Sequence, residues 1–361
     1  MSPLPQSFAR APHALTSPKR PECCPNCGHK KLSRKGVRRK KLETVQLWRC
    51  NNPRCKRVFT PASTALRNKT YPARVILDAL TWYDLGYSLD ETRDKIKAVH
   101  GYAVAPSSIT GWLAEHKSVT TYRRLRAAGL RLFRPLHSVR ACKLYHRQVY
   151  HFAYHRPKLA LLRANSEILR FVPLAHFLES VPQDCPHALF QDGARASQLR
   201  ADVFDPTRVI VTEKENFATR TAAFVLPTIG DNHHRHEALQ RFMLANDSVT
   251  LAVEVPIWLS PADIADIEGR YGIRLRDDGN TSPLTGHIDF LQVRNDALHI
   301  LDYKPNARHD RPVAQLAIYA LAISRLTGIR LFDIKCAWFD EHHYCEFFPR
   351  KLFERGSASR G

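Results

Sequence analysis

The spacing of apolar residues between positions 70 and 118 of this 361-residue chain predicts three short helices. Pro72 suits the first turn of the first helix. The apolar residues of that helix recur every three or four positions: Val75, Ile76, Ala79, Leu80 and Tyr83. Ser88 and Glu91 have the separation of a capping box, so they predict the start of the second helix. Gly101 ends that helix.

The third helix is predicted to begin at Ser107 or Ser108, because serine is a good N-cap. Its buried face comprises Ile109, Trp112 and Leu113. The residues left facing solvent are Ser108, Thr110, Gly111 and His116. Two short helices around a turn, the second exposing small polar side chains, are typical of a helix-turn-helix that enters the DNA major groove. An ordinary small helical bundle is the alternative.

Short apolar runs in the last third of the chain predict strands rather than helices. Residues 288–304 read as a β-hairpin with a two-residue turn at positions 295–296. Counting outward from that turn places Asp289 directly opposite Asp302. Asp302 and Lys304 are two residues apart, so their side chains point to the same face of the sheet.

The region between residues 119 and 229 is the least informative, and we expect a helical connector there that leads into the C-terminal domain. Residues 144–157 predict a helix, because an apolar stripe occurs at helical spacing. The stripe comprises Tyr145, Val149 and Phe152. The histidines of this segment are expected at its polar surface: His146, His151 and His155. The run 209–211 (Val-Ile-Val) predicts a strand.

Charge changes the picture, because the chain is strongly basic. Its net charge is +21, from 55 basic and 34 acidic residues. The first 60 residues carry fifteen Lys and Arg but only two acids, Glu22 and Glu43. Such a surplus favours a polyanionic partner, of which nucleic acid is the usual one. Five arginines that follow the predicted helices could also contact the DNA backbone: Arg123, Arg124, Arg126, Arg131 and Arg134.

Composition also bounds the location of the protein. The first 20 residues are rich in Pro and Ser and predict a disordered leader, with a transit peptide as the alternative. No run approaches 18 apolar residues, so we expect no membrane contact. The 9 cysteines are too few and too unevenly spread for a disulfide scaffold, which favours a reducing, cytoplasmic compartment.

Four of these cysteines have the spacing of metal ligands. They form a C-x2-C pair, Cys24 and Cys27, and a C-x4-C pair, Cys50 and Cys55. Two close pairs supply the four thiolates of a structural zinc site, and Gly28 permits the tight turn after the second ligand. Four unrelated cysteines are the alternative, and the neighbouring Cys23 is a second choice for Cys24. The run between the pairs predicts a basic hairpin suited to phosphates, with Arg38, Arg39, Lys40 and Lys41.

This segment resembles the zinc ribbon that opens many insertion-sequence transposases. The matching residues are the CPNCG motif, Trp48-Arg49-Cys50 and Cys55-Lys56-Arg57-Val58-Phe59-Thr60. The helices that follow resemble the helix-turn-helix of the same transposases, in Gly86–Glu91 and Ser107–Trp112. The resemblance implies a DNA-binding module in which Ser108 and Thr110 face the bases. No transposase catalytic domain follows it in the sequence.

The carboxylates of the C-terminal third predict a second kind of metal site. Asp289 and Asp302, side by side on adjacent strands, repel each other unless a cation or a proton lies between them. Carboxylate oxygens are the ligands that Mg²⁺ and Mn²⁺ prefer. Lys304 on the same face could orient the attacking water or stabilise charge on a phosphate. This combination is what phosphodiester hydrolysis requires.

Three motifs follow one another here: G-x-x-D (Gly286, Asp289), D-x-K (Asp302, Lys304) and Q-x-x-x-Y (Gln315, Tyr319). Residues 230–348 therefore resemble the PD-(D/E)XK nuclease superfamily, in its RecB-like branch. The resemblance implies that Asp289 and Asp302 bind the divalent metal and that Lys304 is catalytic. It places Gln315 and Tyr319 on the following helix, beside the site.

The same resemblance implies two further candidate site residues, His236 and Glu254. His236 matches an upstream metal-ligating histidine, with His234 as second choice and a surface histidine cluster as the alternative. Glu254 matches a family glutamate that either binds the metal or orients the site. Several relatives hold an iron–sulfur cluster. We expect none here, because the four remaining cysteines lack the spacing and are read as free: Cys142, Cys185, Cys336 and Cys345.

The sequence thus predicts a multi-domain protein. A zinc ribbon and a helical helix-turn-helix module precede an α/β restriction-endonuclease-like core, in which helices flank a mixed sheet. The expected segments are 1–20 (leader), 21–61 (ribbon), 70–118 (helix-turn-helix), 119–229 (connector and start of the nuclease domain), 230–348 (nuclease core) and 349–361 (basic tail). The expected function is metal-dependent DNA cleavage, endo- or exonucleolytic. The alternatives are a non-catalytic DNA-binding regulator that uses the core as a clamp, and an RNA nuclease. A homodimer and mobile-element or defence proteins are expected partners.

Overall fold

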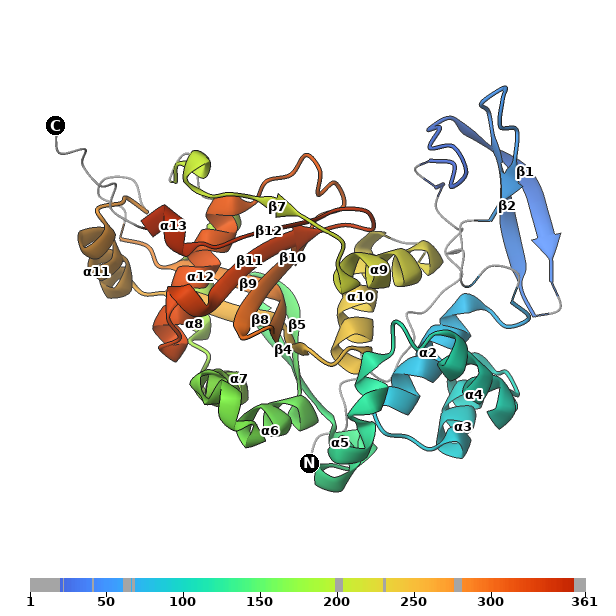
Figure 1. The fold of residues 1–361 in the computed structure, drawn as a ribbon, viewed down its shortest axis with the longest axis horizontal. Coiled ribbons are helices and arrows are strands. Elements are labelled where there is room, and N and C mark those ends of the chain that lie inside the picture. The colour runs from blue at the N-terminus through green and yellow to red at the C-terminus, as the bar shows by residue number, and fades with distance from the viewer. Residues whose placement is uncertain are drawn as a thin grey trace. The chain divides into compact units, whose positions relative to one another are not determined.

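The computed structural model describes residues 20–21, 23–40, 42–60, 66, 69–198, 204–229, 232–275 and 281–353, without the side chains of 206, 232 and 233. Several predicted segments lie outside the described residues. They are the leader except for its last residue, Arg20, then Lys41 of the basic hairpin, and the last eight residues of the basic tail. The chain divides into two compact units (Figure 1). The first contains residues 1–127 and 220–247, and the second 128–219 and 248–361. Every helix among the described residues is too short or too polar to span a lipid bilayer.

The first unit begins with a small antiparallel sheet of three strands, β1 (Leu32–Arg39), β2 (Thr44–Cys50) and β3 (Val58–Phe59). The predicted basic hairpin is confirmed as β1 and β2, which pair with a bulge near Gly36. The buried core of this sheet contains Cys24, Leu32, Trp48, Cys50 and Phe59. So small a core cannot hold a domain together without further cross-links.

Three helices follow, as predicted: α2 (Ala73–Asp84), α3 (Leu89–His100) and α4 (Pro106–Glu115). The capping box of α3 is confirmed. The Glu91 backbone N–H donates to Ser88 Oγ at 3.2 Å, and the Ser88 N–H donates to Glu91 Oε2 at 2.7 Å. Gly101 ends α3 with a φ of 73°. The predicted cap of α4 is wrong: the helix begins at Pro106, so neither Ser107 nor Ser108 caps it.

Two helices from later in the chain follow: α10 (Asn232–Asn246) packs on α2, and Phe224 of α9 (Phe217–Val225) contacts Phe242 of α10. His116 is only 4% exposed and its ring lies 5.0 Å from that of Phe224, so its prediction as a solvent-facing residue is wrong. Asp78 of α2 pairs with Arg241 of α10 at 3.1 Å and with His100 at 2.8 Å. The contact with Arg241 is not predictable from local sequence, because α10 is distant from α2 in the chain.

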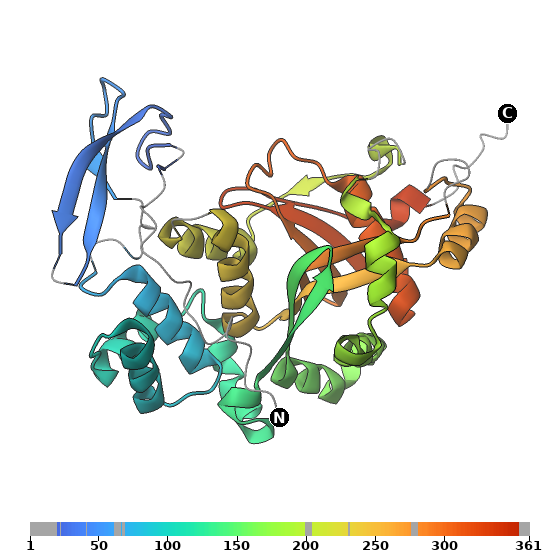
Figure 2. The same cartoon turned by 180° about the vertical axis from the view of Figure 1, so that it is seen from behind.

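The second unit is built on a mixed sheet of nine strands among the described residues (Figures 1 and 2). The strands along the sheet are β4 (Val139–His146), β5 (Gln148–His155), β8 (Thr250–Leu259), β9 (Leu284–Arg294), β10 (Ala297–Tyr303), β11 (Ile334–Phe339), β12 (Tyr344–Phe347) and β7 (Thr212–Glu213). A ninth strand, β6 (Ala194–Arg195), pairs with β9. The β10–β11 and β6–β9 pairs are parallel and the others are antiparallel. The expected mixed sheet flanked by helices is confirmed.

The helices of this unit are α5 (Arg126–Leu132), α6 (Arg156–Ala164), α7 (Val172–Asp184), α8 (His187–Asp192), α11 (Pro261–Tyr271), α12 (Val313–Thr327) and α13 (Arg350–Phe353), the first two residues of α5 belonging to the first unit. The central one is α12, which packs on β8, β10 and β11. Ten of its residues are buried, nine of them between Val313 and Ile323, so it is apolar nearly all round, as a helix enclosed by other elements must be.

The helix predicted over residues 144–157 is wrong. The segment forms the β4–β5 hairpin, which turns at Arg147 with a φ of 61°. Its apolar residues alternate across the two strands, so Phe152 is buried and Tyr145 is exposed. His146 and His155 are buried, not at a polar surface as expected. The strand expected at 209–211 is also wrong: Ile210 is exposed, and the paired strand β7 begins at Thr212.

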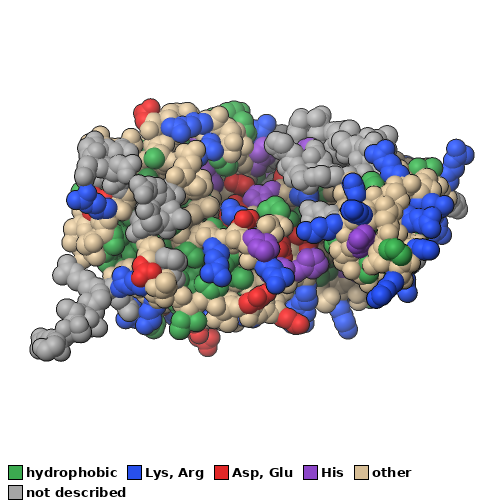
Figure 3. Space-filling model, turned by 90° about the horizontal axis from the view of Figure 1, so that it is seen from above, with side chains coloured by type: hydrophobic (Ala, Val, Ile, Leu, Met, Phe, Trp, Pro, Cys, Tyr) green, Lys and Arg blue, Asp and Glu red, His purple; other side chains and the backbone are tan. Residues whose placement is uncertain are grey.

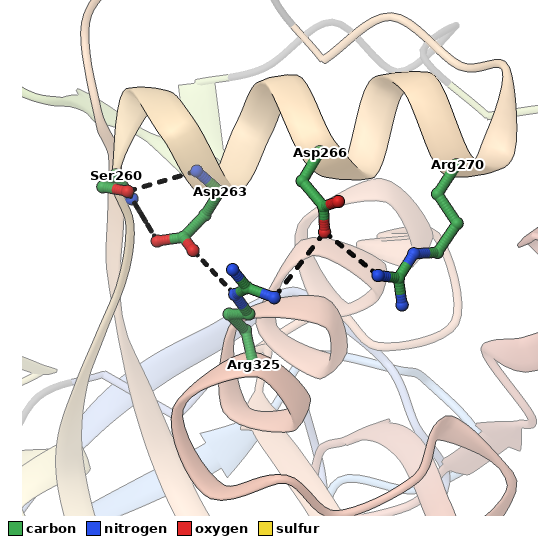
Figure 4. Close-up of polar contacts among 5 residues, drawn as sticks. All are labelled: Ser260, Asp263, Asp266, Arg270 and Arg325. Atoms are coloured by element: carbon green, nitrogen blue, oxygen red, sulfur yellow. Dashed lines mark hydrogen bonds and ion pairs between the residues drawn. The ribbon is translucent and has the colours of Figure 1, made fainter.

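Helix α11 is fixed to α12 by a network of charged side chains (Figure 4). Ser260 and Asp263 form a capping box at the start of α11. Arg325 of α12 donates from Nε to Asp263 Oδ1 at 2.7 Å and lies 3.6 Å from Asp266. Arg270 pairs with Asp266 at 3.2 Å, four residues along the same helix. Exposed pairs of this kind stabilise a fold only modestly, so the network orients α11 rather than holding the domain together.

Candidate functional site

The β9–β10 hairpin has the register that the sequence predicts. Arg294 pairs with Ala297, and the pairing continues outward from there along both strands. Asn295 and Asp296 have φ angles of 47° and 55°, so both adopt the left-handed conformation of a type I′ turn. Asn and Asp accept that conformation more readily than most residues, which is why this dipeptide fixes the register.

Two buried carboxylates lie next to each other where this hairpin pairing ends. The last residue pair of the two strands is Phe290 with Leu301; Asp289 directly precedes Phe290 and Asp302 directly follows Leu301. They are 8% and 3% exposed. Asp289 Oδ2 accepts a hydrogen bond of 2.9 Å from the backbone N–H of Tyr303. Buried carboxylates at neighbouring positions on adjacent strands repel each other unless a cation or proton lies between them.

A third carboxylate extends this row onto the next strand. The β8–β9 register places Glu254 opposite Asp289, and carboxylate oxygens of the two lie within 4.8 Å of each other. Glu254 has a φ of 50°, which is rare for a non-glycine residue inside a strand. Backbone held in this region costs about 1–3 kcal/mol and is found preferentially at functional sites. We call Glu254, Asp289 and Asp302, on β8, β9 and β10, the carboxylate row.

Lys304 provides a positive charge at the end of the carboxylate row. Its Nζ lies 2.8 Å from Asp302 Oδ2. Burial acts to lower the pKa of Lys304, but the charge and hydrogen bond of Asp302 and the charge of Asp289 outweigh it and raise the pKa. The side chain is therefore a fixed ammonium that partly neutralises the row.

Gln315 and Tyr319 lie on one face of α12, as their spacing of four predicts. Gln315 Nε2 donates to the Tyr319 hydroxyl at 3.0 Å. Burial, followed by the charges of Asp302 and Asp289, raises the pKa of Tyr319. A Cβ at Gly286 would overlap the Tyr319 ring, so only glycine fits at this point of β9. The glycine of the G-x-x-D motif is thus explained by the close approach of the tyrosine.

Several polar residues near the carboxylate row are not predicted from the sequence. His287 on β9 stacks on Tyr150 of β5, with ring centroids 3.5 Å apart and planes 8° from parallel. Burial lowers the pKa of His287, and the charges of His146 and Arg195 lower it further. These side chains come from strands far apart in the sequence, so no local motif could have revealed them.

The two histidines predicted as upstream metal ligands lie on α10. His234 and His236 are both partly buried there, in the part of the chain that belongs to the first unit. The assignment of His236 as a ligand of the catalytic metal stays a prediction.

The four cysteines of the N-terminal segment come together as their spacing predicts. Cys24 Sγ lies 3.8 Å from Cys55 Sγ, and Cys27 Sγ lies 3.6 Å from Cys50 Sγ. Four thiolates around a tetrahedral zinc, with bonds of about 2.3 Å, are about 3.8 Å apart. The cluster of Cys24, Cys27, Cys50 and Cys55 could therefore bind a structural zinc with little rearrangement.

Each cysteine pair is shaped by its own tight turn. Gly28 has a φ of 71° after the first pair, as expected, and Lys56 has a φ of 49° after the second. Burial acts to raise the pKa of Cys24, but backbone hydrogen bonds from Asn26 and Cys27 outweigh it and lower the pKa to about 7. Burial raises the pKa of Cys50 to about 12, with the neighbouring thiols adding to the effect. Four thiols cannot all ionise here without a cation.

The residues expected to contact nucleic acid are only partly free to do so. Arg38 and Arg39 are exposed on β1, whereas Lys40 is paired with Glu43 at 2.8 Å. On α4, Thr110 is exposed and Ser108 is half-buried. Lys and Arg side chains are spread over the face drawn in Figure 3, among histidines and acids.

Arg126 has a structural contact that the sequence did not predict. Its guanidinium donates to the carbonyl oxygens of Tyr83, Gly86 and Tyr87 at 2.7–2.8 Å. It also lies over the Tyr83 ring, 4.2 Å from the centroid. Arg126 therefore caps the carbonyls at the turn between α2 and α3, and its guanidinium is already engaged.

Comparison of the chain with protein-family models, with curated proteins and with solved structures finds no match.

Proposed function

We propose that this protein is a metal-dependent nuclease that hydrolyses phosphodiester bonds in DNA. The observation that carries the proposal is the carboxylate row with Lys304 at its end. Glu254, Asp289 and Asp302 occupy neighbouring positions on three adjacent strands. Two of these acids are buried and Glu254 is half-buried, and a bound divalent cation would stabilise acids gathered in this way.

The donor set of the row fits Mg²⁺ or Mn²⁺. Each acid offers oxygens only, and hard divalent cations prefer oxygen ligands. Asp289 and Asp302 would hold the cation, and Glu254 would either bind it or orient the site. A bound cation supplies Lewis-acid activation of the phosphate and of the attacking water.

Protein groups around the row would position and stabilise the reacting phosphate. Lys304 would stabilise negative charge that develops on it, because its ammonium is fixed 2.8 Å from Asp302. Gln315 and Tyr319 would position the row rather than react, because the tyrosine ring packs against Gly286 and its hydroxyl accepts from Gln315. His236 is the proposed additional ligand from α10.

The N-terminal segment would deliver the nuclease to DNA. Exposed Arg38 and Arg39 on the ribbon hairpin are suited to phosphates, and α4 is suited to the major groove. We attribute these features to a relationship with insertion-sequence transposases, and the sheet domain to the PD-(D/E)XK superfamily in its RecB-like branch. A mobile-element or defence role follows from that relationship.

The test is a cleavage assay on linear and circular, single- and double-stranded DNA with Mg²⁺ or Mn²⁺. Wild type should cleave at least one substrate, and chelation should stop cleavage. Asp302→Asn keeps the shape of the side chain but removes the charge that holds the cation, so it should abolish cleavage while DNA binding survives. Asp296→Asn is the matched control, because it makes the same change at the exposed turn of the same hairpin.

Two outcomes would reject the nuclease. Cleavage by Asp302→Asn at the wild-type rate would place the activity elsewhere or in a contaminant. A wild-type protein that binds DNA but cleaves no substrate with any metal would favour the alternative, a non-catalytic regulator that clamps DNA. An RNA substrate in the same assay tests the remaining alternative, an RNA nuclease.

A further inference from the structure

A second group of metal-type ligands lies in the sheet domain, apart from the carboxylate row. His146 Nε2 is 2.8 Å from His187 Nδ1 and 3.8 Å from Cys185 Sγ. One ligand atom from each of the three residues lies within 4.8 Å of the others. We call this group the His-Cys-His cluster.

Two distant segments build the cluster. His146 is the last residue of β4, directly before the left-handed turn at Arg147. Cys185 ends α7 and His187 begins α8, so both come from the short Cys-Pro-His connection between these helices. The cluster therefore joins the end of a hairpin to the junction of two helices.

The distances match those that a tetrahedral zinc would impose. With bonds of about 2.3 Å to sulfur and about 2.0–2.1 Å to nitrogen, sulfur and nitrogen ligands are about 3.6 Å apart, and two nitrogens about 3.3 Å. The observed Cys185–His146 distance of 3.8 Å is close to the first value. The two imidazole nitrogens, at 2.8 Å, would have to separate by about 0.5 Å. His187 is exposed, so its ring can move.

The surroundings of His146 are those of a metal-binding histidine. The residue is 2% exposed, and its ring stacks on Phe190 with centroids 3.7 Å apart. Its other nitrogen, Nδ1, lies 2.9 Å from His287 Nε2. A histidine that binds metal through one nitrogen usually donates a hydrogen bond from the other, which fixes its tautomer and orientation. His287 is placed to accept that bond.

We propose that His146, Cys185 and His187 bind a zinc ion that is distinct from both the four-cysteine cluster and the carboxylate row. One thiolate and two imidazoles are ligands that Zn²⁺ accepts and that Mg²⁺ does not favour. Three protein ligands leave a fourth position, which the exposed side at His187 opens to water. The ion would fasten the β4–β5 hairpin to the α7–α8 junction.

The zinc content of the full-length protein tests this proposal. Wild type should contain about two zinc ions per chain, one in each cluster. His187→Ala and Cys185→Ser should each lower the content by one, and Cys24→Ser/Cys50→Ser should lower it by the other. His176→Ala, an exposed histidine on α7, and Cys336→Ser, a buried cysteine on β11, are the matched controls and should retain two.

Cobalt spectroscopy keeps the test decisive if Cys185→Ser fails to fold. Co²⁺ added to metal-free Cys24→Ser/Cys50→Ser should produce a thiolate-to-cobalt absorption band from Cys185. The same band should disappear when exposed His187 is also replaced by Ala. The proposal is overturned if wild type contains one zinc that Cys24→Ser/Cys50→Ser removes, or if His187→Ala leaves both the zinc content and the cobalt band unchanged.

Discussion

The four-cysteine cluster and the carboxylate row both gather like-charged ligands, but the hydrophobic cores that support them differ greatly in size. The cysteines are attached to a three-stranded sheet with a core of a few residues, Trp48 and Phe59 among them. The carboxylates are attached to a nine-stranded sheet that has a large core of its own. Under the proposed function, a cation at the first site would be needed for folding, whereas a cation at the second would be needed only for chemistry. Loss of metal should therefore unfold one region and merely inactivate the other.

The largest effect is expected from Cys50→Ser. Removing one thiolate should release the zinc and unfold the N-terminal sheet, because that segment has too little core to fold without a cross-link. DNA binding should weaken and its dependence on salt should become shallower, since the basic hairpin is no longer presented. Elemental analysis, hydrogen exchange and binding titrations at several salt concentrations measure these changes.

Cys345→Ser is the control for this experiment, because Cys345 is a buried cysteine of the sheet domain. It should retain the N-terminal zinc and the binding behaviour. Hydrogen exchange in β8 to β12 should stay at the wild-type level in Cys50→Ser. Loss of protection in those strands would contradict the view that the four-cysteine zinc supports only the small sheet.

Lys304→Ala should have the next largest effect, and on chemistry alone. The ammonium is lost beside a site that keeps all three acids, so the cleavage step should slow by about 10²–10³-fold. Single-turnover kinetics at saturating metal measures it. At saturating metal the unfolding midpoint should change little, because the sheet core is untouched and the cation would still balance the acids.

Lys335→Ala is a matched control on the neighbouring strand β11, where the lysine lies 3.6 Å from Glu346. It should cleave at nearly the wild-type rate. Equal rates for wild type and Lys304→Ala would remove the lysine from the mechanism. A lowered metal affinity in Lys304→Ala would instead mean that it orders the carboxylates.

Much of the carboxylate row could be predicted because its geometry depends on a local rule. A two-residue turn at Asn295 and Asp296 fixes which residues face each other, so the neighbourhood of Asp289 and Asp302 follows from counting. The four-cysteine cluster was predictable for a similar reason, since spacing within each pair is a local property. Neither prediction needed knowledge of the remaining fold.

The parts that failed depend on contacts between distant segments. The sequence predicts a helix over the β4–β5 hairpin, because its apolar residues fit the spacing of a helix as well as that of a strand. Pairing of β5 with β8, which is distant in the chain, selects the strand. His116 was expected in solvent, but Phe224 from a much later helix covers it. The His-Cys-His cluster joins residues 146 and 185–187, which no local spacing connects.

Gly286→Ala should have an intermediate effect, on both stability and chemistry. The new methyl would overlap the Tyr319 ring, and overpacking of this kind costs about 1–3 kcal/mol. Displacement of the ring should also disturb the row and slow cleavage. Denaturant unfolding and the cleavage rate measure the two effects, and Gly269→Ala on α11, where a Cβ meets nothing, is the control.

Tyr319→Phe separates the ring from its hydroxyl. It keeps the packing against Gly286 but loses the hydrogen bond from Gln315, so it should slow cleavage less than Gly286→Ala does. If Tyr319→Phe is the slower variant, the hydroxyl has a direct role and the positioning interpretation is wrong.

The smallest effects on stability should come from a matched pair of backbone substitutions, one in each region. Lys56 beside the cysteines and Glu254 in the carboxylate row have nearly the same left-handed φ, 49° and 50°. Glycine adopts this conformation without the steric cost that other residues meet, although it also gains freedom in the unfolded chain. Lys56→Gly and Glu254→Gly should therefore each change the free energy of unfolding by no more than about 1 kcal/mol, in the stabilising direction.

The two substitutions should have similar effects on the free energy of unfolding but different effects on binding and cleavage. Lys56→Gly should keep zinc and DNA binding, because the lysine side chain is exposed and only its backbone shapes the turn. Glu254→Gly should lose cleavage while gaining stability, because the strain there holds a carboxylate opposite Asp289. Glu254→Gln, which keeps a side chain at the strained position but not its charge, should be inactive without the gain. Full cleavage by Glu254→Gly would show that the left-handed conformation only shapes the strand, as at Lys56, and that two carboxylates suffice.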